Sequence, residues 1–515
     1  MPEPPRWIRV SSLKSVDAFR AHIRSLGLSL PCDDSILKES LSPLAQPIET
    51  VRINGKRIGN RYAVQPMEGW DGSLTGGVTE DVMRRWRRFG QSGGKLICGG
   101  EAMAIRPEGK ANPNQLVINE TNKADLANLR LVLAESHRQR HGTCDDLIIG
   151  FQLTHSGRFC KPNDKTRLEP RVAYRHPILD KRFNVTSDSQ LLSDSDVDLL
   201  IVDYIRAARI AWDIGADFVD IKHCHGYLLH EFLSAFGRPG RFGGPFENRT
   251  RILREIVAGI RADGNPIELA VRLSAFDSVP FRPDPKLSRP GKPGPGIPDD
   301  YILPYWHAFG ANPNNPLELD LSEAFEFLDL CARLGVKIVN VSAGSPYYNP
   351  HIQRPATYPP SDGYEPPEDP LIGVWRQIDT VRRLKERANP NLVLVGSAYS
   401  YLQEFLPHVA QHVVRSRWTD LVGFGRMVLS YPDIFTDALE TGELNSKHVC
   451  RTFSDCTTAP RNGLVSGCYP LDEYYKQKAE SNKLKEIKRT YPAEGTRREQ
   501  AQKLPAGGKA RPIDP

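Results

Sequence analysis

The chain has 515 residues, of which 25% are charged and 39% are hydrophobic, and its formal net charge is +6. This balance excludes a disordered or fibrous protein, because neither the hydrophobic fraction nor the net charge is extreme. No apolar run approaches the roughly 18 residues that span a bilayer, and the Pro-rich start has no apolar signal core. Nine scattered cysteines suit free thiols in a reducing compartment. We expect a cytoplasmic globular protein with no membrane partner.

The excess positive charge lies at the C-terminal end of the chain. Residues 476–515 hold 11 Lys and Arg and 5 Asp and Glu, so this segment carries 11 − 5 = +6 and the remainder is neutral. The segment has few large apolar residues, which is typical of a solvated, flexible tail. A nucleic-acid partner is the alternative, but no DNA-binding motif or pattern of interleaved aromatic residues accompanies the charge. The sequence therefore predicts a solubilising tail and no nucleic-acid partner.

In chain order, residues 1–47 form an N-terminal extension with one expected helix over 14–26. Eight short apolar or β-branched runs follow, at 61–67, 95–100, 147–153, 217–222, 267–273, 336–342, 391–397 and 420–425. Several are apolar on both faces, as buried parallel strands are. Helical patterns separate the runs, and clear examples lie at 194–214, 247–262, 322–334 and 373–388. Strands that alternate with helices in this way predict one (β/α)8 barrel over residues 48–440, an α/β fold.

Two long connections interrupt this alternation. Residues 277–316 and 344–372 are rich in Pro, Gly, Asp and Tyr, and each is too long for an ordinary strand–helix loop. They follow the fifth and sixth predicted strands, which places them on the C-terminal face of the barrel, where barrel active sites lie. We expect both to be lids or walls of a substrate pocket.

Polar residues at the C-terminal ends of the predicted strands are the candidates for chemistry. The seventh strand ends in Gly396 and Ser397, and the eighth ends in Gly425 and Arg426. Glycine lets backbone N–H groups approach an anion closely, and arginine adds a bidentate donor. Loops after strands seven and eight commonly bind phosphate in barrels. The pair of signals predicts a phosphate site.

The richest cluster follows the fourth strand and reads Lys222, His223, Cys224, His225 and Tyr227. A zinc site is one interpretation, but three consecutive residues cannot easily converge on one ion when alternate side chains face opposite ways. Ordinary strand-end polarity is a second interpretation. The functional interpretation is that Lys222, His225 and Tyr227 face one pocket, where they polarise a carbonyl and supply a proton.

Three longer motifs identify a family. They are QLTHSGR (152–158), HGYLLHEFLSAFGRPGRFGGPFENRTR (225–251) and VGFGRMVLSYPD (422–433). Over roughly residues 48–440 the sequence resembles the Old Yellow Enzyme family of FMN-dependent NAD(P)H:flavin oxidoreductases. It looks nearest to the branch of 2,4-dienoyl-CoA reductases and trimethylamine dehydrogenases. The resemblance implies a barrel that holds FMN at its mouth, with NAD(P)H as the reductant.

The resemblance also implies a role for each matching residue. The implied flavin-ring contacts are Pro66 and Met67 at the first strand, Gly100 beside the ring, Gln152 at the pyrimidine edge and Arg272 near N1 and O2. The implied phosphate contacts are Gly396, Ser397, Gly425 and Arg426. Tyr227 matches the tyrosine that protonates the substrate after hydride passes from FMN N5 to a carbonyl-conjugated alkene.

Two departures from the family pattern lie at the flavin edge. The usual substrate-gripping pair of histidine with histidine or asparagine reads Lys222 and His225 here. A lysine is a compact positive charge rather than a switchable donor. The position after Met67, which is often Thr or Cys, holds Glu68, and a carboxylate there disfavours an anionic reduced flavin. We expect Glu68 and Lys222 to form an ion pair across the flavin edge.

A third departure concerns the cysteine-containing segment, residues 441–475. Cys450, Cys456 and Cys468 are spaced C-x5-C-x11-C, whereas an iron–sulfur cluster usually takes four thiolates. Phe453 stands where the second cluster cysteine of the branch would be. We expect free thiols, no metal site and FMN as the only redox cofactor.

Two other functions remain compatible with the pattern. One is FMN-dependent oxidation of an amine or alcohol, as in the trimethylamine dehydrogenase relatives. The other is a non-catalytic flavin-binding protein. The expected partner is a small-molecule substrate, and a homo-oligomer is compatible with the sequence.

Overall fold

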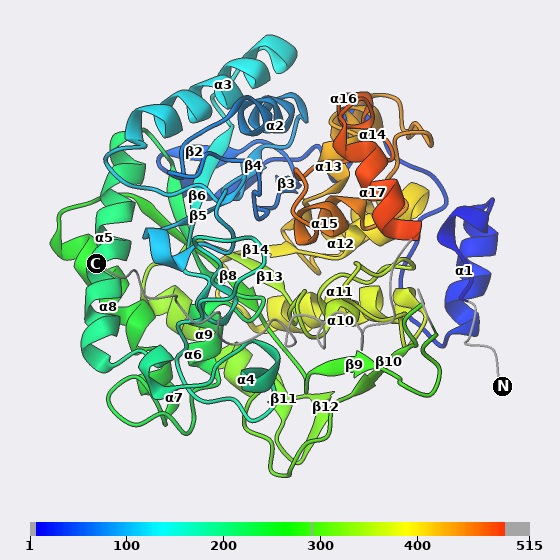
Figure 1. The fold of residues 1–515 in the computed structure, drawn as a ribbon. Coiled ribbons are helices and arrows are strands. Elements are labelled where there is room, and N and C mark those ends of the chain that lie inside the picture. The colour runs from blue at the N-terminus through cyan, green and yellow to red at the C-terminus, as the bar shows by residue number, and fades with distance from the viewer. Residues whose placement is uncertain (1–6, 290–291, 490–515) are drawn as a thin grey trace, which may run out of the picture.

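The structure is a computed structural model that describes residues 7–289 and 292–489. Its centre is a closed ring of eight parallel strands, in the order β3, β4, β6, β7, β8, β13, β14 and β15, with β15 pairing back to β3 (Figure 1). The strands are β3 (Tyr62–Val64), β4 (Leu96–Ile97), β6 (Ile148–Thr154), β7 (Phe218–His223), β8 (Glu268–Ser274), β13 (Ile338–Ser342), β14 (Val393–Gly396) and β15 (Leu421–Phe424). A further short strand, β5 (Ala102–Ala104), pairs with β6. The predicted (β/α)8 barrel is confirmed, and each ring strand lies within a predicted run or extends one residue beyond it.

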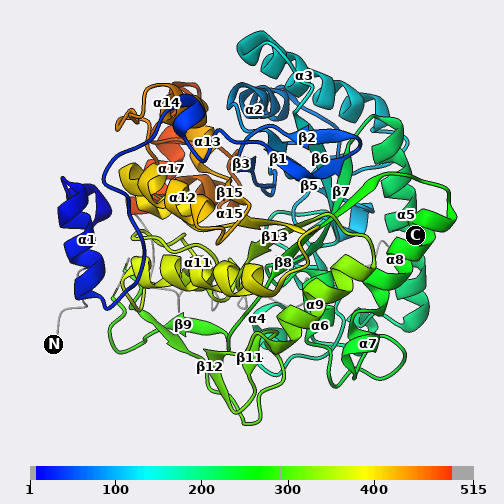
Figure 2. The same ribbon diagram turned by 180° about the vertical axis from the view of Figure 1, so that it is seen from behind.

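Helices surround the ring in both views (Figures 1 and 2). The longer ones are α2 (Glu80–Gln91), α3 (Lys123–His141), α5 (Asp194–Asp213), α8 (Arg251–Ala262), α9 (Ser322–Arg333), α11 (Pro370–Arg387) and α12 (Leu406–Arg415). The shorter ones are α4 (Leu179–Arg182), α6 (Leu228–Leu233), α7 (Phe246–Arg249), α10 (Pro350–Gln353), α13 (Met427–Ser430) and α14 (Ile434–Glu440). Local signals set their limits: α5 begins at a capping box in which Ser193 and Asp196 bond reciprocally.

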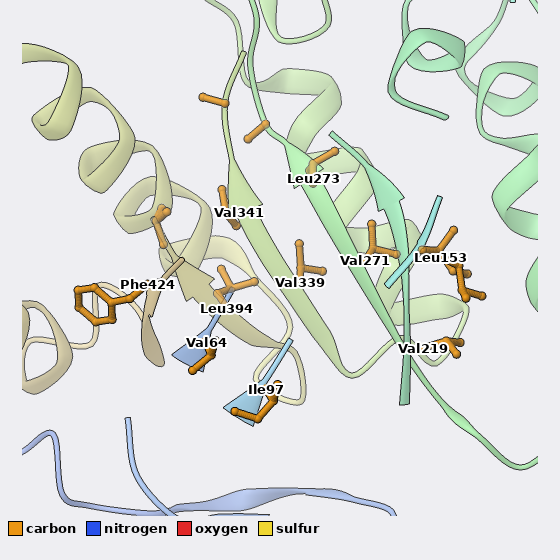
Figure 3. Close-up of a cluster of buried hydrophobic side chains, with 14 of the residues drawn as sticks. Val64, Ile97, Leu153, Val219, Val271, Leu273, Val339, Val341, Leu394 and Phe424 are labelled. Atoms are coloured by element: carbon orange, nitrogen blue, oxygen red, sulfur yellow. The ribbon is translucent and has the colours of Figure 1, made fainter. Parts of the chain in front are cut away.

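Side chains alternate between two hydrophobic layers along each strand. Val271 and Leu273 of β8 and Val339 and Val341 of β13 pack outward against the helices (Figure 3). Residues of the opposite parity face the barrel axis, as the two-residue period of a strand requires. At the N-terminal end of the barrel the inward residues are apolar and form a separate cluster with the hairpin β1 (Ile48–Ile53) and β2 (Lys56–Ile58). This hairpin closes the bottom of the barrel, so the mouth is at the opposite end.

The two long connections contribute differently to the mouth. The segment after β8 folds into two hairpins, β9 (Phe281–Pro283) with β10 (Gly296–Pro298) and β11 (Ala311–Asn312) with β12 (Asn315–Leu319). None of its described residues lines the barrel-mouth cavity or the smaller cavity next to it. Instead Asp277 accepts a hydrogen bond from Tyr348 at 2.5 Å and another from Asn349. The described part of 277–316 is therefore not a wall of these two cavities and instead braces the wall made by the segment after β13. Its role as a lid stays a prediction.

The segments outside the barrel pack against it. Helix α1 (Val16–Ser25) lies on the outside, where Phe19 stacks on Phe405 with ring centroids 4.2 Å apart. After the barrel come α15 (Asp455–Arg461), α16 (Glu473–Lys476) and α17 (Glu480–Arg489). Leu484 of α17 is buried in a small cluster with Tyr469 and Tyr475. The basic tail predicted from residue 476 thus begins as a packed helix, and residues 490–515 lie outside the described residues. Within the described ranges, no helix is long and apolar enough to cross a membrane.

We predict that Gly150→Ala destabilises the barrel. A Cβ at this position of β6 would lie 2.3 Å from the ring of Phe218 on the neighbouring strand. Overpacking of this kind costs about 1–3 kcal/mol, which urea unfolding would measure as a lower midpoint. Gly237→Ala is the matched control, because nothing lies within 4 Å of its Cβ position. Equal stability of the two variants would contradict the tight contact.

Candidate active site

The C-terminal ends of the barrel strands open into a cavity of about 1430 Å³, including its mouth. Six successive strand ends contribute to its lining, with Gln65, Lys222, Arg272, Ser342, Ser397 and Gly425. These residues continue the inward-facing rows of the strands above the apolar layer, so the barrel interior changes from apolar to polar along its axis. The change places the site at the end where barrel enzymes carry their chemistry.

A hydrogen-bonded polar layer forms the floor of this cavity. Gln65 Nε2 donates to Ser397 Oγ at 2.7 Å and to Asn340 Oδ1 at 3.0 Å. Gln152 Nε2 donates to Asp220 Oδ2 at 2.7 Å, across the neighbouring strands β6 and β7. Burial raises the pKa of Asp220 to about 6. The layer holds polar side chains in fixed orientations, because buried polar groups need partners.

Two buried donors of this layer have no partner among the described residues. They are Nε of Arg272 and Nδ2 of Asn340. Another nitrogen of Arg272, Nη1, donates a hydrogen bond to the carbonyl oxygen of Pro66 at 2.9 Å. Unpaired buried donors are costly unless a ligand satisfies them. The barrel mouth is therefore suited to a ligand with an acceptor-rich edge, which a flavin pyrimidine ring offers.

The predicted phosphate residues divide into two groups. Ser397, Gly425 and Arg426 line the cavity, and Arg426 forms no ion pair within the described part of the chain. Burial, and after it the nearby charge of Arg354, lowers the pKa of Arg426 to about 10. An arginine in this setting fits a phosphate dianion. Gly396 does not line the cavity; a Cβ there would lie 2.9 Å from the Tyr399 hydroxyl, so packing explains this glycine.

Of the residues implied for the flavin ring, some line the cavity and others lie behind its lining. Pro66, Met67 and Glu68 line the cavity. Gly100 does not, and its backbone explains the glycine: φ is +55° and a Cβ would lie 2.7 Å from Trp86. Its carbonyl accepts a hydrogen bond from Met67 N at 3.1 Å. Gly100 therefore holds the first-strand turn in place rather than facing the cavity.

The expected pair between Glu68 and Lys222 is present. Lys222 Nζ donates to Glu68 Oε1, while Glu68 Oε2 accepts from Gln115 Nε2 at 3.0 Å. The side chain of Lys222 is only 3% exposed. Its ammonium also lies 3.6 Å from the ring centroid of Tyr227, a cation–π contact. The pair brings a full positive and a full negative charge to the cavity wall.

His225 faces the same cavity as Lys222 and Tyr227, whereas His223 points outward to Phe327. His225 adopts φ +65°, which turns the chain at the strand end. Its Nε2 is 2.8 Å from Ser342 Oγ. Burial, followed by the charges of Arg272 and Lys222, holds the pKa of His225 well below its usual range. The imidazole is therefore neutral and able to donate one hydrogen bond.

Tyr227 lies at the start of α6 and is 1% exposed. Its hydroxyl is hydrogen-bonded to the hydroxyl of Tyr347, at 2.8 Å. Burial, and then the charge of Glu68, raises the pKa of Tyr227 well above its usual value. The phenol is protonated at neutral pH and can act as a proton donor.

The cysteine-containing segment reaches the cavity through α15. Cys450 and Cys456 are among the lining residues, whereas Cys468 is not. In the described ranges, no three His, Cys, Asp or Glu residues are placed to hold a metal ion. The same segment also contributes Arg461, which donates to the carbonyl oxygen of Pro346 at 3.1 Å.

The sequence interpretation missed several lining residues. Gln65 and Ser342 are polar residues at the C-terminal ends of strands, which is the same signal that pointed to Gln152. The sequence could therefore have indicated them. Tyr347, Arg354 and Arg461 carry no comparable signal, because they come from the long segment after β13 and from the segment after the barrel.

Comparison with known proteins agrees with this architecture. A family model described as the NADH:flavin oxidoreductase / NADH oxidase family matches residues 43–283. The NADPH dehydrogenase of Geobacillus sp. (strain WCH70) is 30% identical over 240 residues, which cover 44% of this chain and 63% of that protein. The match thus spans less than two thirds of that relative's length.

Solved structures show the same fold. A 2-naphthoyl-CoA reductase in complex with 2-naphthoyl-CoA superposes with a TM-score of 0.57 at 17% identity, covering 86% of this chain and 58% of that chain. An Old Yellow Enzyme homologue from Zymomonas mobilis gives 0.52 at 20% identity, covering 78% and 94%. Over residues 43–283 this chain is therefore similar to the NADH:flavin oxidoreductase / NADH oxidase family, and the solved structures share its barrel fold.

Proposed function

We propose that this protein is an FMN-dependent oxidoreductase that passes hydride from NAD(P)H to a carbonyl-conjugated alkene. The observation that carries the proposal is the convergence of Lys222, His225 and Tyr227 on one cavity that also contains Arg272 and Arg426. The first three are suited to a carbonyl and a proton transfer. The two arginines are suited to a cofactor with a phosphate at one end and, at the other, an acceptor-rich ring edge that gains negative charge on reduction.

The cofactor is held by this chain's own donors. Arg426, Ser397 and Gly425 would bind the phosphate, and Arg272 would face the pyrimidine edge. Gln152 does not line the cavity and donates to Asp220 beneath it. When bound, FMN supplies reversible hydride transfer at N5. Arg272 favours negative charge on the reduced ring, because its guanidinium is buried and has no carboxylate partner among the described residues.

The substrate carbonyl would meet two donors of different kinds. Lys222 offers ammonium protons that the pair with Glu68 does not use, and neutral His225 offers one N–H. Donors fixed before the substrate arrives stabilise the enolate-like charge that develops on the carbonyl oxygen. Tyr227 then delivers the proton to the α-carbon.

An anaerobic screen tests the function. The purified protein, loaded with FMN, is reduced with NADH or NADPH and mixed with cyclohex-2-enone, while the flavin absorbance is followed. We expect reduction by a nicotinamide and reoxidation by the enone. Reduction by an amine or alcohol with no response to the enone would instead support the oxidase-like alternative, and a flavin inert to all of these would support a binding protein.

We predict that Tyr227→Phe retains FMN and its reduction by NAD(P)H but reoxidises slowly with the enone. Loss of a general acid typically costs about 100-fold or more. Stopped-flow absorbance separates the two half-reactions. Unchanged reoxidation by the enone would refute the role of Tyr227 as proton donor.

We predict that Glu68→Gln raises the flavin midpoint potential. The variant leaves the charge of Lys222 uncompensated beside the ring, which favours the anionic reduced state. A rise of about 30 mV corresponds to about 1.4 kcal/mol for a two-electron couple. Glu80→Gln is the control, because its carboxylate is 77% exposed on α2. Identical potentials for wild type and Glu68→Gln would rule out the electrostatic role.

We also propose that FMN is the only redox group. Only three cysteines occur in residues 441–475, and a cluster usually needs four thiolates. We predict iron far below one equivalent per chain by elemental analysis of the purified holoprotein. Near-stoichiometric iron together with visible absorbance beyond that of flavin would overturn the proposal.

A further inference from the structure

Tyr227 is enclosed in a way that restricts how its proton can be replaced. The side chain is 1% exposed, and within the described residues its hydroxyl has one hydrogen-bond partner, the hydroxyl of Tyr347 at 2.8 Å. A buried acid that gives up its proton in every turnover recovers it most directly through a hydrogen bond that is already formed. The structure therefore raises the question of which neighbour can supply it.

The other polar neighbours of Tyr227 contact groups other than its hydroxyl. The ammonium of Lys222 lies over the ring face, at 3.6 Å from its centroid, and is paired with Glu68. His225 is held by Ser342 at 2.8 Å, with Gln353 at 3.5 Å from the same nitrogen. Neither contact involves the Tyr227 hydroxyl, so Tyr347 is the group placed for the transfer.

Tyr347 connects this buried hydroxyl to the open part of the cavity. It is half-buried and lines the cavity, and its ring stacks on Phe159 with centroids 4.1 Å apart and an interplanar angle of 25°. Its backbone lies in the segment braced by Asp277 through Tyr348 and Asn349. This packing holds the Tyr347 side chain so that its hydroxyl points toward Tyr227 while part of its ring faces the cavity.

We propose that Tyr347 is a positioning residue that orients the Tyr227 hydroxyl and returns its proton after each transfer. This inference rests on the proposed alkene reduction. As hydride reaches the β-carbon, the Tyr227 O–H bond breaks and a C–H bond forms at the α-carbon. The Tyr347 proton passes to the Tyr227 oxygen, and a water proton restores Tyr347. The sum is alkene, NAD(P)H and one solvent proton converted to the saturated carbonyl compound and NAD(P)⁺.

The test compares two oxidants of the reduced holoenzyme in stopped-flow experiments. Cyclohex-2-enone needs a proton on carbon, whereas ferricyanide takes electrons and needs none. For Tyr347→Phe we expect reduction by NADPH and reoxidation by ferricyanide at wild-type rates. Over repeated turnovers with NADPH, each of which requires the proton to be returned, we expect kcat with the enone to fall about tenfold, with an unchanged KM for the enone. This loss is smaller than the loss of about 100-fold or more expected when the proton donor itself is removed.

Two further variants separate proton return from packing. Tyr469→Phe is the matched control, because its phenol is buried away from the cavity and donates to the carbonyl oxygen of Val465 at 2.7 Å; wild-type rates are expected. The double variant Tyr227→Phe with Tyr347→Phe should be no slower than Tyr227→Phe alone, since Tyr347 acts only through Tyr227.

The outcomes are distinguishable. If wild type itself is not reoxidised by the enone, the proposed function fails. If wild type is reoxidised and Tyr347→Phe is equally fast, the inference about Tyr347 is wrong. A loss with both oxidants, or an additional loss in the double variant, would assign Tyr347 a packing role and equally overturn the inference.

Discussion

The ion pair between Glu68 and Lys222 is the interaction on which the candidate site depends. Burying the ammonium of Lys222, which is 3% exposed, costs a large desolvation free energy, and the attraction of the Glu68 carboxylate offsets that cost. The partner comes from the turn after β3, on the other side of the barrel mouth. The pair ties the first-strand turn to the end of β7 and sets Lys222 against the Tyr227 ring. Removing either partner leaves a buried charge and disturbs the proton donor.

The barrel makes this pairing possible by separating polar and apolar residues along one axis. The inward-facing residues at the lower end of the strands form an apolar cluster closed by the β1–β2 hairpin. Farther along the same strands the inward positions become polar, as in Phe218, Asp220 and Lys222 of β7. The apolar end supplies the burial energy that holds the strands together. The polar end can then retain donors without partners, such as Arg272 Nε, for a ligand.

Sequence patterns were sufficient for the barrel because parallel strands are short, apolar and regularly spaced between helices. They were also sufficient for Lys222, His225, Tyr227, Arg272 and Arg426, since all follow strand ends, and these ends share one face. Gly100 and Gly396 show the limit of the same reasoning. Both were assigned to the cofactor, yet the structure explains them by contacts with Trp86 and Tyr399, which no spacing in the sequence reveals.

The sequence by itself determined the strand order, the face that carries the site and the charge types present there, because these follow from local periodicity and chain direction. Only the tertiary structure decided which long-range partners meet. Tyr347 reaches Tyr227 from 120 residues away, and Arg461 enters the cavity from the segment beyond the barrel. Such contacts depend on how irregular loops pack, and loop packing is set by the whole fold rather than by a local pattern.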